Sequence, residues 1–295
     1  MTSKALPGLP PGLQCKYDTL REIIASIGGC VIGFSGGVDS TLLFAVAVEV
    51  LGERALAVTA TSETYPEQEL TEAQELASRI GGRHQVIVSE ALDIPEFKDN
   101  PRNRCYYCKK EMFGKLRSIA VEEGLPHVLD GANVDDRSDH RPGRQAAFEI
   151  EVRSPLEEAG FTKEDIRTLS QALELPNWDK PAYACLSSRF PYGGAITRER
   201  LHQVGQAEES LRELGFRILR VRYHGSVARL ELGPDEFLQA TTDLRDQVVQ
   251  RIKGAGFTYV AIDLQGYRTG AMNEGDQRIN LLQPLQRPAG QGDVG

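Results

Sequence analysis

The chain has 295 residues, of which 40% are hydrophobic and 26% charged, as in a soluble globular protein of one large and one small domain. Its net charge of −8 argues against a nucleic-acid binder that relies on a generally basic surface. The sequence has no apolar run of membrane-spanning length and no hydrophobic signal core. We therefore expect a cytoplasmic protein. Its five cysteines suggest metal binding or catalysis more strongly than disulfide bonds.

A strand, a glycine turn and a helix start follow one another early in the chain. Cys30–Phe34 is apolar and of strand length, Gly36 and Gly37 come next, and residues 40–47 have the composition of a buried helix. Glycines let the backbone adopt positive φ and approach a ligand closely, and the helix start presents N–H groups and a positive dipole end. We therefore expect Ser35–Ser40 to form an anion cradle.

The side chains of this cradle define its chemistry. Ser35 and Ser40 supply hydroxyl groups, and Asp39 is expected either to cap the helix or to hold a cation. A Walker loop needs a lysine that reaches the terminal phosphates. Asp39 stands at the matching position, which excludes a P-loop ATPase.

Strands and helices alternate over the following residues. We predict strands over residues 55–60, 84–88 and 127–130, and helices over 18–27, 66–80, 112–123 and 162–173. This alternation predicts an α/β fold with a doubly wound parallel sheet. Thr61 ends one strand, and Asp130–Asp136 begins a polar loop that we expect to run to Arg144. Both lie where such a sheet presents ligand-binding groups.

The last third of the chain has a different pattern. Residues 178–196 lack periodicity and are expected to form an ordered, functional connection. A helix at 197–214, strands at 216–224 and 227–232, a helix at 234–252 and a strand at 258–264 predict a small α+β unit. We expect a flexible leader (1–14), a nucleotide-binding domain (15–177), the active-site connection (178–196), a small α+β domain (197–280) and a flexible tail (281–295).

The cysteines allow several interpretations. Cys105 and Cys108 form a C-x-x-C pair in a predicted loop before a helix, which suits one metal ion or one redox disulfide. With Cys185 they would hold zinc together with a fourth ligand, or a 4Fe–4S cluster with one iron open to exogenous sulfur. The alternative is that Cys185 is catalytic by itself and that the pair is structural or spare. Cys30 is expected to be a small buried hydrophobe, and Cys15 lies in the predicted leader.

Alternation places three basic or polar residues on one face of a predicted strand. Arg220, Arg222 and His224 would form a phosphate or carboxylate clamp, or the solvated face of an edge strand. Glu208 and Glu231 would hold a cation or pair with the arginines.

Several ordered motifs carry a family resemblance. Ser35–Ser40 resembles the PP-loop of the ATP pyrophosphatases, which bind the β- and γ-phosphates of ATP and release pyrophosphate. Over about residues 15–280 the sequence resembles the LarE family, on the motifs at 35–40, 103–109, 130–136, 141–143, 178–189 and 265–268. The resemblance implies a Rossmann-like fold of the PP-loop ATP pyrophosphatase (adenine nucleotide alpha hydrolase-like) type.

The resemblance also implies an activity. LarE proteins are ATP-dependent sulfur transferases that help make the nickel-pincer nucleotide cofactor of lactate racemase. Using ATP and Mg²⁺, they adenylate the carboxylates of pyridinium-3,5-biscarboxylic acid mononucleotide, and a sulfur nucleophile then replaces AMP. The residues expected to bind these nucleotides are Ser35, Gly36, Gly37, Val38, Asp39, Ser40, Thr61, Glu208, Arg220 and Arg222. Cys185, Asp39 and Arg189 are the expected catalytic residues, with Arg189 positioning the substrate.

The resemblance extends to the sulfur source and the assembly. In single-cysteine members the counterpart of Cys185 gives up its own sulfur and becomes dehydroalanine. Because this chain also has Cys105 and Cys108, it resembles the three-cysteine members, in which these residues and Cys185 hold a 4Fe–4S cluster. The family implies a homo-oligomer, commonly a hexamer, and we expect no nucleic-acid or membrane partner.

Other functions remain as alternatives to a cluster-dependent sulfur transferase. One is sacrificial sulfur donation from Cys185 alone, and another is a PP-loop tRNA thiolase. The acidic charge and the single C-x-x-C pair count against the thiolase. An amide-forming ligase of the NAD or GMP synthetase type needs ammonia delivery rather than thiols. A nucleotide-binding scaffold without chemistry is disfavoured by the intact loop.

Overall fold

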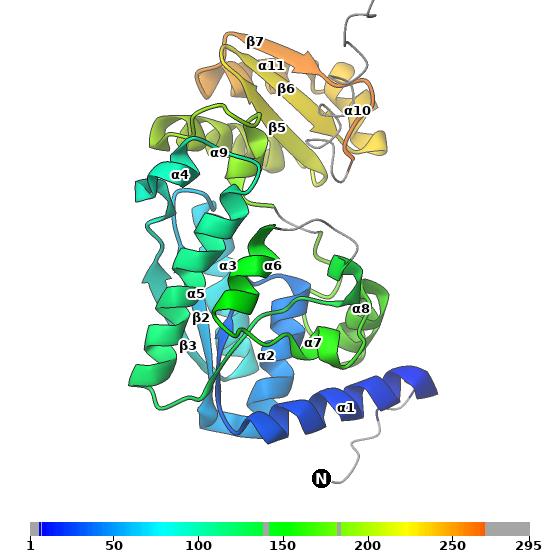
Figure 1. Ribbon diagram of the computed structural model, residues 1–295. Coiled ribbons are helices and arrows are strands. Elements are labelled where there is room, and N and C mark those ends of the chain that lie inside the picture. The colour runs from blue at the N-terminus through cyan, green and yellow to red at the C-terminus, as the bar shows by residue number, and fades with distance from the viewer. Residues whose placement is uncertain (1–5, 7, 138–141, 182–183, 269–295) are drawn as a thin grey trace, which may run out of the picture. The chain divides into compact units, whose positions relative to one another are not determined.

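The computed structural model describes residue 6 and residues 8–137, 142–181 and 184–268 (Figure 1). The chain divides into two compact units, residues 1–206 and 207–295, and the division falls within helix α9 (Arg198–Glu213). No helix within these described residues is long and apolar enough to cross a bilayer.

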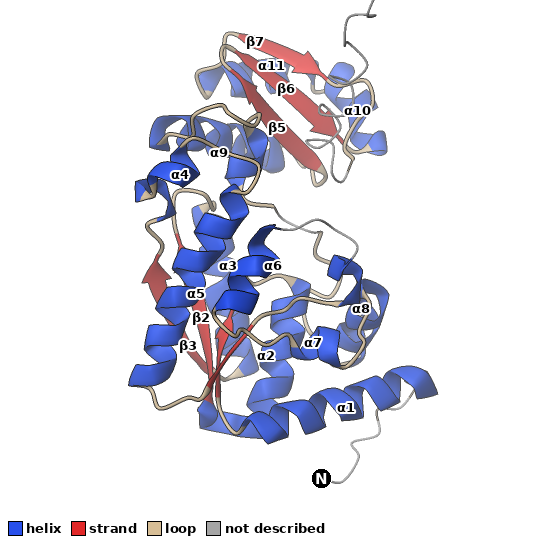
Figure 2. Cartoon of the chain, viewed as in Figure 1, coloured by secondary structure: helices blue, strands red, loops and turns tan. Residues whose placement is uncertain are grey.

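A parallel sheet lies at the centre of the first unit (Figure 2). Its strands are β1 (Cys30–Gly33), β2 (Ala55–Thr61), β3 (Arg83–Val88) and β4 (His127–Leu129). They pair side by side in the order β3-β2-β1-β4. The chain therefore leaves β1 towards β2 on one side and finds β4 on the other, which makes the end of β1 a topological switch point. This confirms the doubly wound α/β fold.

Helices flank this sheet. In chain order they are α1 (Pro11–Ile27), α2 (Val38–Leu51), α3 (Glu67–Ile80), α4 (Pro95–Lys98), α5 (Arg104–Glu122), α6 (Pro142–Glu149), α7 (Pro155–Glu158) and α8 (Lys163–Ala172).

Alternate residues of β1 face two different hydrophobic cores. Cys30 and Ile32 pack with residues of α1, α2, α3, α7 and α8, whereas Val31 packs with α5. This is the two-residue period of a strand buried on both faces. Cys30 is fully buried, and its burial raises the pKa of the thiol to about 12. The prediction that Cys30 is a buried hydrophobe is thus confirmed.

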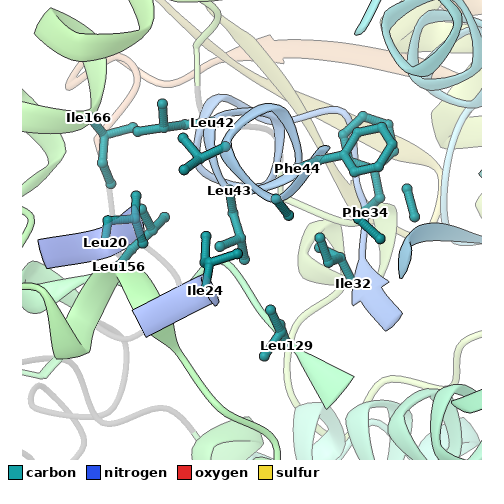
Figure 3. Packing of buried hydrophobic residues seen from close by; sticks show 14 of the residues in the cluster. Leu20, Ile24, Ile32, Phe34, Leu42, Leu43, Phe44, Leu129, Leu156 and Ile166 are labelled. Carbon is teal, nitrogen blue, oxygen red and sulfur yellow. The ribbon is translucent and has the colours of Figure 1, made fainter. Parts of the chain in front are cut away.

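Helix α2 carries much of the first core. Figure 3 shows Leu42, Leu43 and Phe44 leaving this helix in different directions, towards Ile166, Ile24 and Phe34. Because apolar side chains surround α2, the loop that precedes it is attached to a helix packed on several sides.

The second unit contains a smaller sheet with helices α10 (Pro234–Thr241) and α11 (Arg245–Gly254). Its strands are β5 (Leu219–His224), β6 (Val227–Leu232) and β7 (Tyr259–Ile262). Strands β5 and β6 are antiparallel, and β6 and β7 are parallel. A β5-β6-β7 sheet with helices confirms the smaller C-terminal α+β unit.

The structure corrects several predicted boundaries. Helix α1 begins at Pro11, inside the predicted leader, because Leu13 and Tyr17 pack into the core; residues 1–5 and 7 lie outside the described residues. The polar loop predicted to reach Arg144 gives way to α6. The helix predicted at 234–252 is two helices, since the hydroxyl of Thr242 donates to the Leu238 carbonyl and the backbone turns there.

Candidate active site

The loop after β1 turns sharply at Gly36. This glycine has φ +69°, and a Cβ placed on it would lie 3.2 Å from the backbone of Ala73 in α3. Both facts require glycine. Gly37, which we also predicted to use positive φ, is instead extended at φ −78° and is the N-cap residue of α2. The glycine pair therefore works through one left-handed turn and one extended residue.

Hydroxyl groups hold the loop in shape. The Ser40 hydroxyl donates to the Gly37 carbonyl at 3.1 Å and lies 3.2 Å from the Ser35 hydroxyl. The Gly37 N–H donates to the Ser35 hydroxyl at 3.3 Å. These hydrogen bonds connect Ser35, Gly37 and Ser40 at the first turn of α2, where helix N–H groups lack intrahelical partners.

Asn177 fixes the loop from behind. Its side-chain amide Nδ2 donates to the Gly36 carbonyl at 3.0 Å and to the Thr41 hydroxyl at 2.9 Å, and the residue is buried. One side chain thus connects the left-handed turn to the first turn of α2. The sequence pattern gave no signal for this role, because a single asparagine has no characteristic spacing.

Asp39 lies in the first turn of α2 and does not cap it. Its carboxylate pairs with the Lys163 ammonium at 2.5 Å, and it accepts a hydrogen bond from the Asn133 amide at 3.3 Å. Both charged side chains stay partly exposed, Lys163 at 31% and Asp39 at 25%. No local sequence pattern indicates Lys163, which lies 124 residues further along the chain.

The segment after β4 packs against this loop. Gly131 lies so close that a Cβ there would be 3.0 Å from the Ser40 nitrogen. Asp130 accepts a hydrogen bond from the Ser154 hydroxyl at 2.7 Å, and Asp135 accepts one from the Lys163 backbone N–H at 2.8 Å. The structure thus brings the motif at 130–136 to the PP-loop, as its predicted place at the switch point implied. Arg141 lies outside the described residues.

Cys185 stands at the start of a 3₁₀ turn, Leu186–Arg189. The Leu186 N–H donates to the Thr64 carbonyl at 2.8 Å, which attaches the turn to the segment following β2 and Thr61. Arg189 is fully buried and donates to the Ala184 carbonyl at 2.8 Å and the Ser188 hydroxyl at 2.7 Å. In this position Arg189 holds the turn that follows Cys185, which we call the cysteine turn. That Arg189 positions the substrate stays a prediction.

The C-x-x-C pair lies in the first turns of α5, rather than in a loop before it. The helix begins at Arg104, whose buried guanidinium donates to the Asn100 side chain at 2.6 Å. Asn100 in turn donates to the Pro191 carbonyl at 2.8 Å. The start of α5 is therefore tied to the segment that follows Cys185.

The three thiols affect one another. The pKa of Cys108 is raised to about 12, first by burial and then by negative charge on Cys185 and Cys105. Cys108 therefore holds its proton at neutral pH, unlike the low-pKa thiolate of a redox C-x-x-C.

The donor chemistry of three thiols fits an iron–sulfur cluster, whose iron would stabilise the thiolate form. Within the described residues, however, no group of three or more His, Cys, Asp or Glu side chains is arranged to hold a metal ion. The thiols interact without forming a preassembled site.

The second unit has a polar sheet face built from arginines and glutamates. The register places Arg220 opposite Glu231 and Arg222 opposite Arg229. The fully buried Glu231 accepts from Arg222 at 2.7 Å and from Arg229 at 3.0 Å. The pairing of Glu231 with arginines is one of the two roles that we left open for it.

The neighbours of Arg220 complete this face. Its guanidinium lies 5.0 Å from the centre of the Tyr267 ring, a cation–π contact. The pKa of His224 is lowered by burial and then by Arg229 and Arg222, which agrees with the predicted common face. Glu208 is fully buried, accepts from the Val221 N–H at 2.9 Å and pairs with Arg212 at 3.2 Å.

Comparisons with known proteins agree with this architecture. The NAD synthase family matches residues 14–100, which contain the loop at 35–40. An uncharacterised protein of Synechocystis is 45% identical over 88% of this chain and 98% of its own length. A glutamine-hydrolysing GMP synthase of Aeropyrum pernix is 28% identical over 66% of this chain but only 43% of its own length.

Another relative with a named activity matches nearly the whole chain. The pyridinium-3,5-bisthiocarboxylic acid mononucleotide synthase of Lactiplantibacillus plantarum is 40% identical over 263 residues, which are 89% of this chain and 95% of the relative. Identity at this level over nearly the whole length, on a PP-loop α/β fold, establishes that the two proteins belong to one family. The chain therefore belongs to the LarE family of PP-loop proteins.

Proposed function

We propose that this protein is an ATP-dependent sulfur transferase. It adenylates the carboxylates of pyridinium-3,5-biscarboxylic acid mononucleotide and converts them to thiocarboxylates, as a step towards a nickel-pincer nucleotide. The observation that carries the proposal is the 40% identity over 95% of a synthase whose name states the bisthiocarboxylic product. The PP-loop geometry and the cysteine turn of this chain support it.

The first step needs a site for the leaving pyrophosphate. A substrate carboxylate oxygen attacks the α-phosphorus of ATP, the bond from that phosphorus to the α–β bridging oxygen breaks, and pyrophosphate leaves as the acyl adenylate forms. The ring of hydroxyls on Ser35 and Ser40 and the start of α2 bind the β- and γ-phosphates. Asp39 faces the cation that accompanies ATP.

The second step replaces AMP by sulfur. In the sacrificial alternative the Cys185 sulfur attacks the acyl carbon and AMP leaves. The Cβ–S bond of the thioester then breaks with loss of the α-proton, which leaves dehydroalanine and a thiocarboxylate. We prefer the cluster route, in which Cys105, Cys108 and Cys185 hold a 4Fe–4S cluster. When bound, this group would supply the sulfur without consuming a cysteine.

The second unit is proposed to bind the phosphate of the mononucleotide. Arg220 and Arg222 provide two guanidinium groups on one sheet face, and guanidinium matches phosphate geometry. Glu231 pairs with Arg222 and holds its guanidinium in place, and Glu208 pairs with Arg212 of α9. We also expect a homo-oligomer, with a hexamer as the first expectation. Light scattering would measure the number of subunits.

Pyrophosphate release tests the adenylation step. We expect Asp39→Ala and Ser40→Ala to abolish pyrophosphate release from ATP in the presence of the dicarboxylate mononucleotide. Ser26→Ala is a matched control, because the exposed Ser26 hydroxyl only donates to the carbonyl of Ile23 in its own helix. Unchanged release in both loop variants would contradict the PP-loop assignment.

Iron and sulfide analysis tests the sulfur source. Under anaerobic conditions we expect iron and acid-labile sulfide in the wild type and their loss in Cys105→Ala, Cys108→Ala and Cys185→Ala. Absence of iron, with a single turnover that removes the sulfur of Cys185 by mass spectrometry, would instead establish the sacrificial route.

A further inference from the structure

The PP-loop of this chain lacks a cation of its own. Residues 33–41 contain no lysine or arginine, and Asp39 stands where a Walker loop has its lysine. Triphosphate brings several negative charges to this loop, and Asp39 adds another. A positive group from elsewhere in the chain would offset this repulsion, in addition to the cation that accompanies ATP.

Lys163 is placed to provide that charge. Its ammonium lies 2.5 Å from the Asp39 carboxylate, and the side chain is 31% exposed, so it is held at the loop without being enclosed. A lysine has a flexible four-carbon stem, so the ammonium can exchange one anionic partner for another while its backbone stays fixed.

The backbone of Lys163 is held firmly. It is the first residue of α8, whose N-terminus has a capping box between Thr162 and Asp165. Its N–H donates to Asp135 in the segment that packs on the loop. Ile166, one turn further along α8, is buried in the same core as Leu42 of α2. The start of α8 is therefore anchored beside the start of α2.

We propose that Lys163 is a phosphate-binding residue of the PP-loop site, which leaves Asp39 and binds the β- or γ-phosphate when ATP arrives. Lys163 thus does from α8 what the Walker lysine does from within its own loop. Asp39 holds the ammonium in place before ATP binds and is then released to face the cation of MgATP. The proposal rests on ATP use at this loop.

Binding measurements separate this role from simple charge pairing. The probe is α,β-methylene-ATP, whose α–β linkage cannot be cleaved, titrated by calorimetry without the second substrate. Loss of a hydrogen bond to a charged group predicts that Lys163→Met weakens its binding about 10- to 100-fold. Binding of AMP, which lacks the β- and γ-phosphates, should change by less than about twofold.

A double-variant cycle tests the alternative that Lys163 only neutralises Asp39. In an Asp39→Asn background that alternative predicts no further effect of Lys163→Met. Our proposal predicts that the loss of affinity persists there. Lys163→Arg keeps the charge and should retain part of the affinity.

Lys16→Ala is the matched control. Lys16, in α1, pairs at 2.7 Å with Asp165, which lies in α8 like Lys163. The side chain of Lys16 is 34% exposed, similar to that of Lys163. It should bind the analogue as the wild type does.

The outcomes distinguish the inference from the proposed function. Three results would overturn the role of Lys163. They are wild-type affinity for the analogue in Lys163→Met, a loss of affinity seen only in proteins that retain Asp39, and an equal loss of affinity for AMP. A wild-type protein that binds neither ATP nor the analogue would contradict ATP use itself.

Discussion

Replacing Asn177 by alanine tests whether the PP-loop is held from behind. The change removes two hydrogen bonds donated by one buried amide, to the Gly36 carbonyl at 3.0 Å and the Thr41 hydroxyl at 2.9 Å. At about 1 kcal/mol per bond, the free energy of unfolding should fall by about 2 kcal/mol. Asn177→Asp should cost more, because it removes both donors and places a carboxylate against the Gly36 carbonyl.

Urea denaturation measures this effect, and Thr41→Val is its control. That variant removes the hydroxyl partner and leaves the bond to Gly36, so it should cost about half as much, about 1 kcal/mol. A loss below about 0.5 kcal/mol for Asn177→Ala would place it among ordinary surface changes and refute the reasoning. Equal losses in Asn177→Ala and Thr41→Val would show that the bond to Gly36 holds nothing.

Variants at three further positions should respond in the same urea assay. Gly36→Ala should lower stability by about 1–2 kcal/mol for the left-handed backbone alone, with more from the close contact to Ala73. Glu231→Ala should cost about 3–5 kcal/mol, because it leaves the Arg222 charge buried, and Glu231→Gln should cost less. Because burial raises the pKa of Cys30 to about 12, the unfolded thiol ionises first as pH rises above about 9. The Cys30 thiol should therefore lower wild-type stability between pH 9 and 12 by up to about 1.4 kcal/mol per unit. Cys30→Ala should have a slope smaller by this amount, since Cys108, with its raised pKa, still contributes.

Local sequence signals predicted the parts of the fold that depend on local chemistry. The apolar run at 30–34 and the glycines after it determine a buried strand and a turn, and both formed where expected. Alternation placed Arg220 and Arg222 on one sheet face, because successive side chains of a strand point to opposite sides. These inferences need only neighbours along the chain.

Contacts between distant segments were not predictable in the same way. Lys163 and Asn177 meet the PP-loop only after α8 and the segment beyond it have packed against α2. Their immediate neighbours in sequence indicate only a helix start for Lys163 and a turn beyond the helix for Asn177. The start of α5 was missed for a related reason. Its first turn is anchored by Arg104 and Asn100 through contacts with residues 190–193.

The raised pKa of Cys108 bears on the choice between the two sulfur routes. A sacrificial mechanism needs only the Cys185 thiol and gains nothing from two more cysteines nearby. Negative charge on Cys105 or Cys185 makes it harder for Cys108 to ionise, so three thiolates together are unfavourable unless a cation joins them. A metal cluster held by all three cysteines would remove that penalty, and its binding would release the Cys108 proton. Burial is the first cause of the raised pKa of Cys108 and the neighbouring thiols are the second, so a thiolate at this position would need a bound cation, and the iron analysis of the three cysteine variants decides whether a cluster supplies it.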